Sequence, residues 1–184
     1  VADLSPEARK VTNLKGCQDC IPTLDEVLEV LAPAGVGLHV EIKVGPSGLP
    51  YADLDSQVVK CLRAHDVAQR AYLTSFDLSV LKSCRAHSPD TARLVSADRA
   101  HVENSGGLDS FLSKMRGLAD IVALQHDYFS DIFDQVTQGW PIEHLCAWTV
   151  NEPEIMKNWL DRGVGHLTTD APDLALALRR SGRG

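Results

Sequence analysis

The sequence lacks long hydrophobic runs, and basic residues are in the minority. No stretch approaches the roughly 18 uninterrupted apolar residues that a membrane-spanning helix needs, so we expect no transmembrane segment. The 18 Lys and Arg residues against 25 Asp and Glu give a formal net charge of −7. This balance argues against nucleic-acid binding, because phosphate contacts need clustered Lys and Arg. The one basic cluster, Arg179, Arg180 and Arg183, is expected to end a helix and form a solvated tail.

Cysteines are few and are not spaced as a disulfide framework. The chain has five of them, an odd number, which favours a reducing compartment and predicts a cytoplasmic location. Cys17 and Cys20 form a CxxC motif, as in half of a zinc site or a redox pair. A zinc site would need two more soft ligands at matching spacing, and a redox motif should begin a helix directly after a strand. Neither pattern is present, so we expect a loop with two thiols.

Glycine-rich phosphate loops are also absent. Neither GxGxxG nor GxxxxGK[ST] occurs, so an open nucleotide-binding sheet loses its usual support. Instead, short β-rich runs alternate with amphipathic stretches about six times, which is the spacing of βα units. The expected strands are residues 38–44, 71–75, 92–96, 121–125, 145–150 and 166–169.

The stretches between these strands carry helix signals. Thr23 and Glu26 form a capping box, and Asn151 and Glu154 repeat the pattern before a helix that Gly163 should stop. Apolar residues recur at helical spacing in five places: 24/27/28/31, 58–62, 78/81, 108/111/112/115 and 155/156/159/160.

Regular βα alternation predicts an α/β fold with a parallel sheet covered by helices. The two main architectures are an open doubly wound sheet and a closed TIM (β/α) barrel, and the missing phosphate loop favours the barrel. A TIM barrel takes roughly 250 residues for eight units, so 184 residues correspond to about six. We therefore expect residues 1–184 to form a single domain, an incomplete TIM barrel of about six βα units.

The most informative strand is Leu38–Lys43. Side chains alternate along a strand, so His39, Glu41 and Lys43 share one face, and the apolar residues between them occupy the other. In a barrel, the charged face looks inward, where an unpaired charge would cost several kcal/mol. Glu41 and Lys43 therefore need a metal, an anionic ligand or each other, and a plain ion pair at the strand end is the simplest alternative.

Five blocks in this order resemble the glycerophosphodiester phosphodiesterase family. They cover most of the chain, from about residue 20 to about residue 172. The resemblance implies a TIM barrel that hydrolyses glycerophosphodiesters, which are small-molecule substrates, to glycerol 3-phosphate and an alcohol with a divalent cation, Ca²⁺ or Mg²⁺. The blocks are Ile21–Leu28, Glu41–Lys43, Thr74–Asp77, Trp148–Asn151 and Thr168–Pro172.

The resemblance also implies roles for individual residues. Glu41 would be a metal-ligating carboxylate, and Lys43 would be a catalytic cation that stabilises charge on the phosphoryl oxygens. Phe76 and Trp148 would be apolar walls for the glycerol backbone, with core filling as the alternative. His126 follows an expected strand end and is a candidate substrate-binding residue.

The family's catalytic histidines and its ExD metal ligands lie upstream of the Ile-Pro-Thr-Leu block. Only about twenty residues precede that block, and they contain no His and no ExD. We therefore expect an N-terminally truncated barrel in which the first two strands are missing, and an isolated chain that is close to inert. The ladder edges of its first and last strands would be exposed, which predicts self-association.

The remaining histidines are expected to play no part in catalysis. His39 is expected to be a hydrogen-bonded core imidazole, and His166 should lie at the start of the last strand, away from the chemistry. Two alternative functions stay open: a non-catalytic incomplete barrel that binds or is completed by a partner, and a hydrolase of bulkier phosphodiesters similar to phospholipase D-like toxins. Helix or loop positions at the surface are expected for His65, His87, His101 and His144.

Overall fold

A computed structural model describes residues 5–13, 16 and 18–181. Within them, six parallel strands form one sheet in sequence order, so each strand pairs with its neighbour in the chain. Every connection is therefore a crossover through helical segments, as a βα repeat requires. The strands are β1 (Leu38–Glu41), β2 (Ala71–Ser75), β3 (Ala92–Ala97), β4 (Ile121–Gln125), β5 (Leu145–Trp148) and β6 (His166–Leu167).

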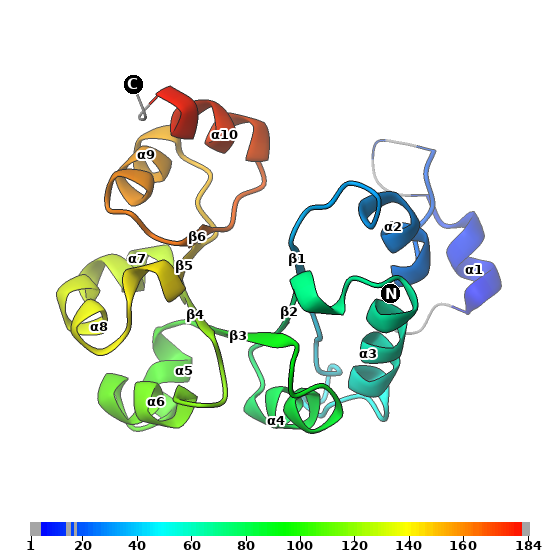
Figure 1. Ribbon diagram of the computed structural model, residues 1–184, viewed down its shortest axis with the longest axis horizontal. Helices are drawn as coiled ribbons and strands as arrows, with labels where there is room; N and C mark the ends of the chain where they lie inside the picture. Colours follow the sequence, from blue (N-terminus) through cyan, green and yellow to red (C-terminus); the bar gives the residue numbers. More distant parts are fainter. Residues whose placement is uncertain (1–4, 14–15, 17, 182–184) are drawn as a thin grey trace.

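The helices lie on the outer side of the sheet. In Figure 1 the strands form an inner arc, and the helices that follow them form an outer ring. The α-helices are α1 (Pro6–Val11), α2 (Leu24–Leu31), α3 (Leu54–Ala64), α4 (Leu78–His87), α5 (Arg99–Asn104), α6 (Leu108–Met115), α7 (His126–Asp131), α8 (Phe133–Gly139), α9 (Pro153–Asp161) and α10 (Pro172–Ser181), with two 3₁₀ turns, Ala68–Arg70 and Ile142–His144.

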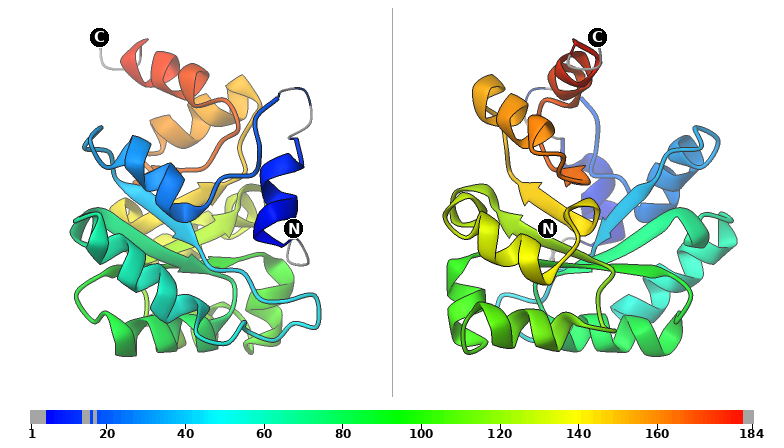
Figure 2. Two further views of the ribbon diagram at one scale, coloured as in Figure 1. Left: turned by 90° about the vertical axis from the view of Figure 1, so that its right-hand side faces the viewer. Right: turned by 60° about the vertical axis from the view of Figure 1, so that its left-hand side comes forward.

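The sheet is curled rather than flat. Both turned views in Figure 2 show the strands wrapping around a concave side. The rings of His39 on β1 and His166 on β6 have centroids 5.3 Å apart, and Tyr72 of β2 contacts both. First and last strands thus meet through side chains across the interior. The structure confirms the predicted incomplete TIM barrel and excludes the open doubly wound sheet, in which helices would cover both faces.

The two faces of β1 separate as the alternation predicts. Leu38 and Ile42 are buried in an apolar cluster, with Leu28 of α2 and Leu62 of α3 among its members. A larger cluster fills the space between β3–β5 and the helices outside them, and includes Phe129 and Trp159, whose rings stack at 4.4 Å. Most of the apolar burial therefore lies between sheet and helices. The concave face carries a smaller buried cluster of Leu94, Ile121, Ala123 and Cys146 beside its polar groups.

Several strands are shorter than expected. β1 ends at Glu41, although the Ile42 amide still donates to the Thr74 carbonyl at 2.7 Å. Val44 turns away and forms an isolated antiparallel bridge with Pro50, so it has left the sheet. The chain after Glu41 is thus a loop at the rim of the barrel.

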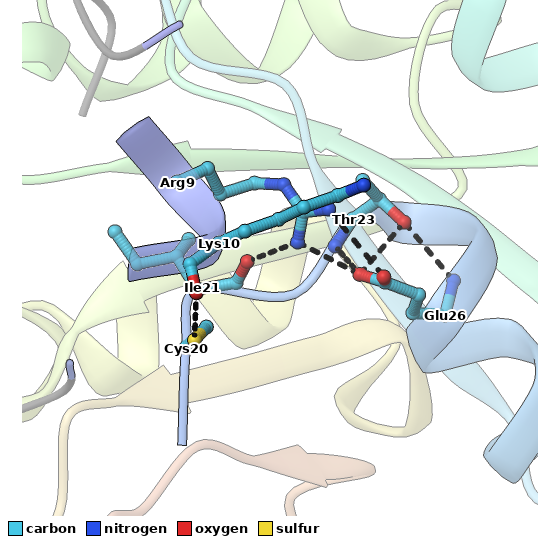
Figure 3. A network of polar contacts seen from close by, with 6 residues as sticks. All are labelled: Arg9, Lys10, Cys20, Ile21, Thr23 and Glu26. Atoms are coloured by element: carbon cyan, nitrogen blue, oxygen red, sulfur yellow. Dashed lines mark hydrogen bonds and ion pairs between the residues drawn. The ribbon is translucent and has the colours of Figure 1, made fainter. Parts of the chain in front are cut away.

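One of the two predicted capping boxes is correct. The Glu26 amide donates to Thr23 Oγ1 at 3.2 Å, and Glu26 Oε2 accepts from the Thr23 amide at 2.6 Å. Figure 3 shows that Arg9 of α1 joins this box, with Nη1 2.9 Å from Glu26 Oε2. The Asn151 box is wrong, because α9 begins with Pro153 at its first position and Glu152 as an N-cap without a side-chain bond. Gly163 does follow α9 with a positive φ of 80°.

The predicted CxxC loop and the predicted basic cluster lie partly outside the described residues. Cys17 and Arg183 are not described, so the structure reports only on Cys20, Arg179 and Arg180. The Cys20 thiol donates to the Lys10 carbonyl (Figure 3), and the described cysteines are all free. Arg179 lies in the last turn of α10, as expected. No helix in the described part of the chain is long and apolar enough to cross a membrane.

Candidate functional site

A hollow of about 380 Å³ opens on the concave side at the carboxyl ends of the strands. Glu41 and Lys43 line it together with Phe76 and Trp148, so four of the five predicted site residues meet here. Its volume falls in the range of small-ligand sites. A separate hollow of about 570 Å³ between α9 and α10 contains none of the predicted site residues.

Glu41 and Lys43 face the concave side, as the strand alternation predicts. Lys43 Nζ lies 3.3 Å from Glu41 Oε2, so the ion-pair alternative is also realised. The Glu41 side chain is 36% exposed and that of Lys43 is 75% exposed. An ion pair as exposed as this contributes at most about 1 kcal/mol. The ion pair can therefore open at a small cost in free energy, which leaves both charged groups able to bind a ligand.

The segment that carries these charges is fastened to the end of β2. Ser75 is buried, and its Oγ donates to the Ile42 carbonyl at 2.8 Å and accepts from the Asp77 amide at 3.2 Å. Asp77 in turn caps α4, with Oδ1 accepting from the Ser79 and Val80 amides. Part of the Thr74–Asp77 block therefore acts by holding two strand ends in register.

Aromatic rings form one wall of the hollow. Phe76 and Trp148 have ring centroids 5.3 Å apart in an edge-to-face arrangement. Both are half-buried, so each ring packs against the other and also presents part of its surface to the hollow. The Trp148 Nε1 atom is buried and has no hydrogen-bond partner among the described residues.

His101 lies at the surface, as predicted, and it also lines a hollow next to the one described above. It lies on α5 with its side chain 44% exposed, and its ring centroid is 5.3 Å from that of Phe76. Together with Glu41 and Lys43 it lines an adjoining hollow of about 590 Å³. His101 Nδ1 is 2.7 Å from Asp98 Oδ1. Although burial raises the pKa of Asp98, hydrogen bonds from the His101 amide and ring lower it overall.

Two further histidines were assigned settings from the sequence: His126 lies away from the hollows, and His39 differs from its predicted setting. His126 is the first residue of α7, with Nδ1 3.2 Å from Asp127 Oδ1, and it lines neither of these two hollows. The expected hydrogen-bonded core setting of His39 is wrong, because its ring opens onto the concave hollow and has no hydrogen bond within the described residues. Partial desolvation beside Tyr72 and His166 lowers the pKa of His39.

The last two sequence blocks are joined to each other. Asn151 Nδ2 donates to Asp170 Oδ2 at 2.7 Å, and its Oδ1 accepts from the Asp170 amide at 2.9 Å and from Thr169 Oγ1 at 3.2 Å. The loops that follow β5 and β6 are therefore clamped by side chains. This use of Asn151 explains why it does not cap α9.

The oxygen donors around the main hollow fit part of a hard-cation site. Glu41 is the one carboxylate among the residues that line it, and the hydroxyls of Thr74, Ser96 and Thr168 are also on its wall. Ca²⁺ and Mg²⁺ bind six or more oxygens, usually with more than one carboxylate or several waters. The described residues thus account for one strong ligand of such an ion and not for a full shell.

Comparisons with known proteins agree on one family. The model of the "Glycerophosphoryl diester phosphodiesterase family" matches residues 2–174. A glycerophosphodiester phosphodiesterase from Caldanaerobacter subterraneus subsp. tengcongensis is 23% identical over 164 residues, which are 88% of this chain and 63% of that protein. The chain thus spans less than two thirds of the length of this relative.

Solved structures share the fold. A crystal structure from Agrobacterium tumefaciens str. C58 superposes with a TM-score of 0.84 at 24% identity, covering 98% of this chain and 73% of that one. An Oleispira antarctica phosphodiesterase in complex with the product sn-glycerol-3-phosphate gives a TM-score of 0.68 at 22% identity, covering 88% and 62%. At these identities, the similarity shows the curled α/β arrangement.

Proposed function

Because this chain belongs to the glycerophosphoryl diester phosphodiesterase family, we propose that it contributes the phosphate-binding and glycerol-binding side of a metal-dependent phosphodiesterase site. The observation that carries the proposal is the meeting of Glu41, Lys43, Phe76 and Trp148 in one hollow at the carboxyl ends of the strands. Active sites of TIM barrels lie at this end. The substrate would be a glycerophosphodiester, and the products glycerol 3-phosphate and an alcohol.

Each residue has a role that its setting supports. Lys43 is mobile enough at 75% exposure to turn from Glu41 to an anionic oxygen, where its fixed positive charge stabilises the phosphoryl transition state. Glu41 supplies one carboxylate to a divalent cation, Ca²⁺ or Mg²⁺, which would polarise the phosphoryl group. Phe76 and Trp148 offer apolar surface to the glycerol carbons. His126 lines neither hollow, and its substrate-binding role stays a prediction.

Among the described residues that line this hollow, His39 is the one imidazole, so no pair of histidines is available there for acid and base catalysis. Absence of such assistance costs about 10²- to 10⁴-fold in rate for each group. We therefore propose that the 184-residue chain binds glycerol 3-phosphate but hydrolyses diesters slowly. Binding is thus the sharper test of the site.

The test is a calorimetric titration of the chain with sn-glycerol 3-phosphate, with and without Mg²⁺ or Ca²⁺. Lys43→Met should weaken binding by about 10- to 100-fold, since a hydrogen bond to a charged group contributes roughly 1.5–3 kcal/mol. The matched control Lys82→Met, on the exposed side of α4, should leave the affinity unchanged. Glu41→Gln should reduce the metal-dependent part of the affinity, and Glu29→Gln on α2 should not.

Absence of any measurable binding, or equal effects of Lys43→Met and Lys82→Met, would contradict the proposal. Release of glycerol phosphate from choline, ethanolamine and inositol diesters gives the activity readout. Hydrolysis of bulkier phosphodiesters in preference to these would favour the toxin-like alternative.

One observation favours a second function, a non-catalytic or partner-completed barrel. β1 pairs only with β2, and β6 only with β5, among the described strands, so each has an outer edge without a ladder partner. Such edges promote pairing with another chain. A defined oligomer in sizing chromatography, with no glycerol 3-phosphate binding, would support this function over the first. The cytoplasmic location stays a prediction.

A further inference from the structure

A cluster of three different metal-ligating side chains joins α2 to α3, outside the hollow described above. It consists of Asp25 on α2, Cys61 on α3 and His65, which directly follows α3. One ligand atom from each lies within 4.8 Å of the other two. Figure 1 shows α2 and α3 side by side, and their apolar residues share one buried cluster. The backbone that carries the three groups is therefore held by packing.

We infer that Asp25, Cys61 and His65 form a binding site for a single borderline divalent cation, Zn²⁺ being the best fit, with water as the fourth ligand. The inference is independent of the proposed function, because no residue of this site lines the concave hollow.

The distances suit a tetrahedral ion. Zn²⁺ lies about 2.0–2.1 Å from nitrogen and oxygen ligands and about 2.3 Å from sulfur, so neighbouring ligand atoms in a tetrahedron are about 3.3–3.6 Å apart. His65 Nε2 lies 3.0 Å from Asp25 Oδ1, and Cys61 Sγ lies 3.3 Å from the same oxygen. Small outward movements of the three side chains would leave room for the ion at the centre.

The sequence spacing and the charges also suit a cation. Cys61 and His65 are four residues apart, so they lie on one side of the last turn of α3. The C-terminal end of a helix carries partial negative charge, which favours a bound cation. A thiolate and a carboxylate, with a neutral imidazole, would offset the two positive charges of the ion. The mixed S, N and O donor set favours Zn²⁺ over Ca²⁺ or Mg²⁺, which bind oxygen.

The protons in the metal-free cluster must be displaced for binding. The pKa of Asp25 is lowered, chiefly by its hydrogen bond with His65 and then by that with Cys61, so the carboxylate is already ionised. Burial, and then the neighbouring Asp25, raises the pKa of Cys61 to about 11. On binding, the Cys61 S–H bond breaks, its proton passes to solvent, and a metal–sulfur bond forms. Glu26, next to Asp25, is engaged by Arg9 and Thr23 and is not a ligand.

The consequence for the fold is a cross-link between two helices. An ion bound by the folded chain and not by the unfolded chain stabilises the fold in proportion to its affinity. The site would thus fasten α2, which carries part of the first sequence block, to α3, which follows β1.

The experiment uses Co²⁺ as a spectroscopic probe on the full chain, with Cys17 and Cys20 both replaced by Ser so that the CxxC motif cannot contribute. Thiolate ligation to Co²⁺ gives an intense charge-transfer absorption that oxygen ligation by Glu41 at the concave hollow does not, and Cys61→Ser distinguishes Cys61 from Cys146, which also lines that hollow. We expect this band to saturate at one equivalent of Co²⁺ and to disappear on addition of Zn²⁺. Zn²⁺ should also raise the melting temperature.

Two variants test the ligands, and one serves as the control. Cys61→Ser should abolish the band, and His65→Gln should weaken Co²⁺ binding at least about tenfold. His87→Gln removes the similar His87–Asp55 pair, whose atoms are 3.1 Å apart and which belongs to no such cluster, and it should leave the band unchanged. Circular dichroism of each metal-free variant checks that it is folded.

Absence of the band in the parent, or a band that survives Cys61→Ser, would overturn the inference. Binding of glycerol 3-phosphate should be the same in the parent and in Cys61→Ser. Failure of the zinc site is thereby distinguishable from failure of the proposed function.

Discussion

Ser75→Ala tests whether the end of β2 positions the charged rim of the hollow. Ser75 is 1% exposed, and its hydroxyl makes both a donated and an accepted hydrogen bond. The substitution leaves the Ile42 carbonyl and the Asp77 amide without these partners. A buried polar group left unsatisfied costs about 1–3 kcal/mol. Because the Ile42 amide and the cap of α4 keep their other bonds, we expect the free energy of unfolding to fall by about 2–3 kcal/mol.

The assay is equilibrium unfolding in urea, followed by tryptophan fluorescence and by circular dichroism. A loss of about 2–3 kcal/mol out of a typical 5–15 kcal/mol leaves the variant folded. The matched control is Ser56→Ala, which removes one exposed hydrogen bond from Oγ to the Asp53 carbonyl at 2.9 Å and should change stability by less than about 0.5 kcal/mol.

A second readout separates positioning from stability alone. Glu41 and Lys43 flank Ile42, so loss of the Ser75 bond should loosen both and weaken glycerol 3-phosphate binding in the folded variant. The Ser56→Ala protein should bind as the parent does. Equal losses of stability in the two variants, or unchanged affinity in Ser75→Ala, would refute this reasoning.

Two other regions give further predictions. Burial lowers the pKa of His39 below 6.5, and burial together with the like charge of His39 lowers the pKa of His166 in the same direction. As the pH falls, the unfolded chain therefore binds protons before the folded chain does, so stability should fall below about pH 6.5. Urea unfolding at two pH values should show a smaller fall in the double variant His39→Gln/His166→Gln. An equal pH effect in both proteins would contradict this prediction. Arg93 is 7% exposed and donates from Nε to the Leu118 carbonyl at 2.7 Å and from Nη1 to that of Thr91 at 2.8 Å, so Arg93→Met should cost about 3 kcal/mol in the same assay. Arg93→Lys should recover only part of that loss, because an ammonium lacks the planar fork of donors, and full recovery would argue against the carbonyl contacts.

The sequence predicted the faces of the strands better than their ends. Which way a side chain of β1 points depends on a period of two residues, which is local and visible in Leu38–Ile42. Where β1 stops depends on Val44 meeting Pro50 in a bridge, a contact between loop residues that no strand pattern indicates. The inward direction of Glu41 could thus be predicted, whereas the short ladder could not.

Asn151 illustrates how a local signal loses to a tertiary one. Its position three residues before Glu154 is typical of an N-cap. Two loops that follow neighbouring strands meet at the rim, however, and Asp170 there offers both a carboxylate and an amide to the Asn151 side chain. With Pro153 already starting α9 without needing a donor partner, the cap contributes little and the clamp is favoured.

The same distinction between local and tertiary contacts applies to His101 and to the cluster of Asp25, Cys61 and His65. The bond between His101 and Asp98 is local and can be predicted, because an Asp directly before a helix often caps it and meets the residue three positions on. Contact with Phe76 depends instead on how far the sheet curls between β2 and β3. Asp25 and His65 are likewise 40 residues apart. Contacts between side chains far apart in the sequence therefore carry no local signature. They include both the contact of His101 with Phe76 and the contact of Asp25 with His65.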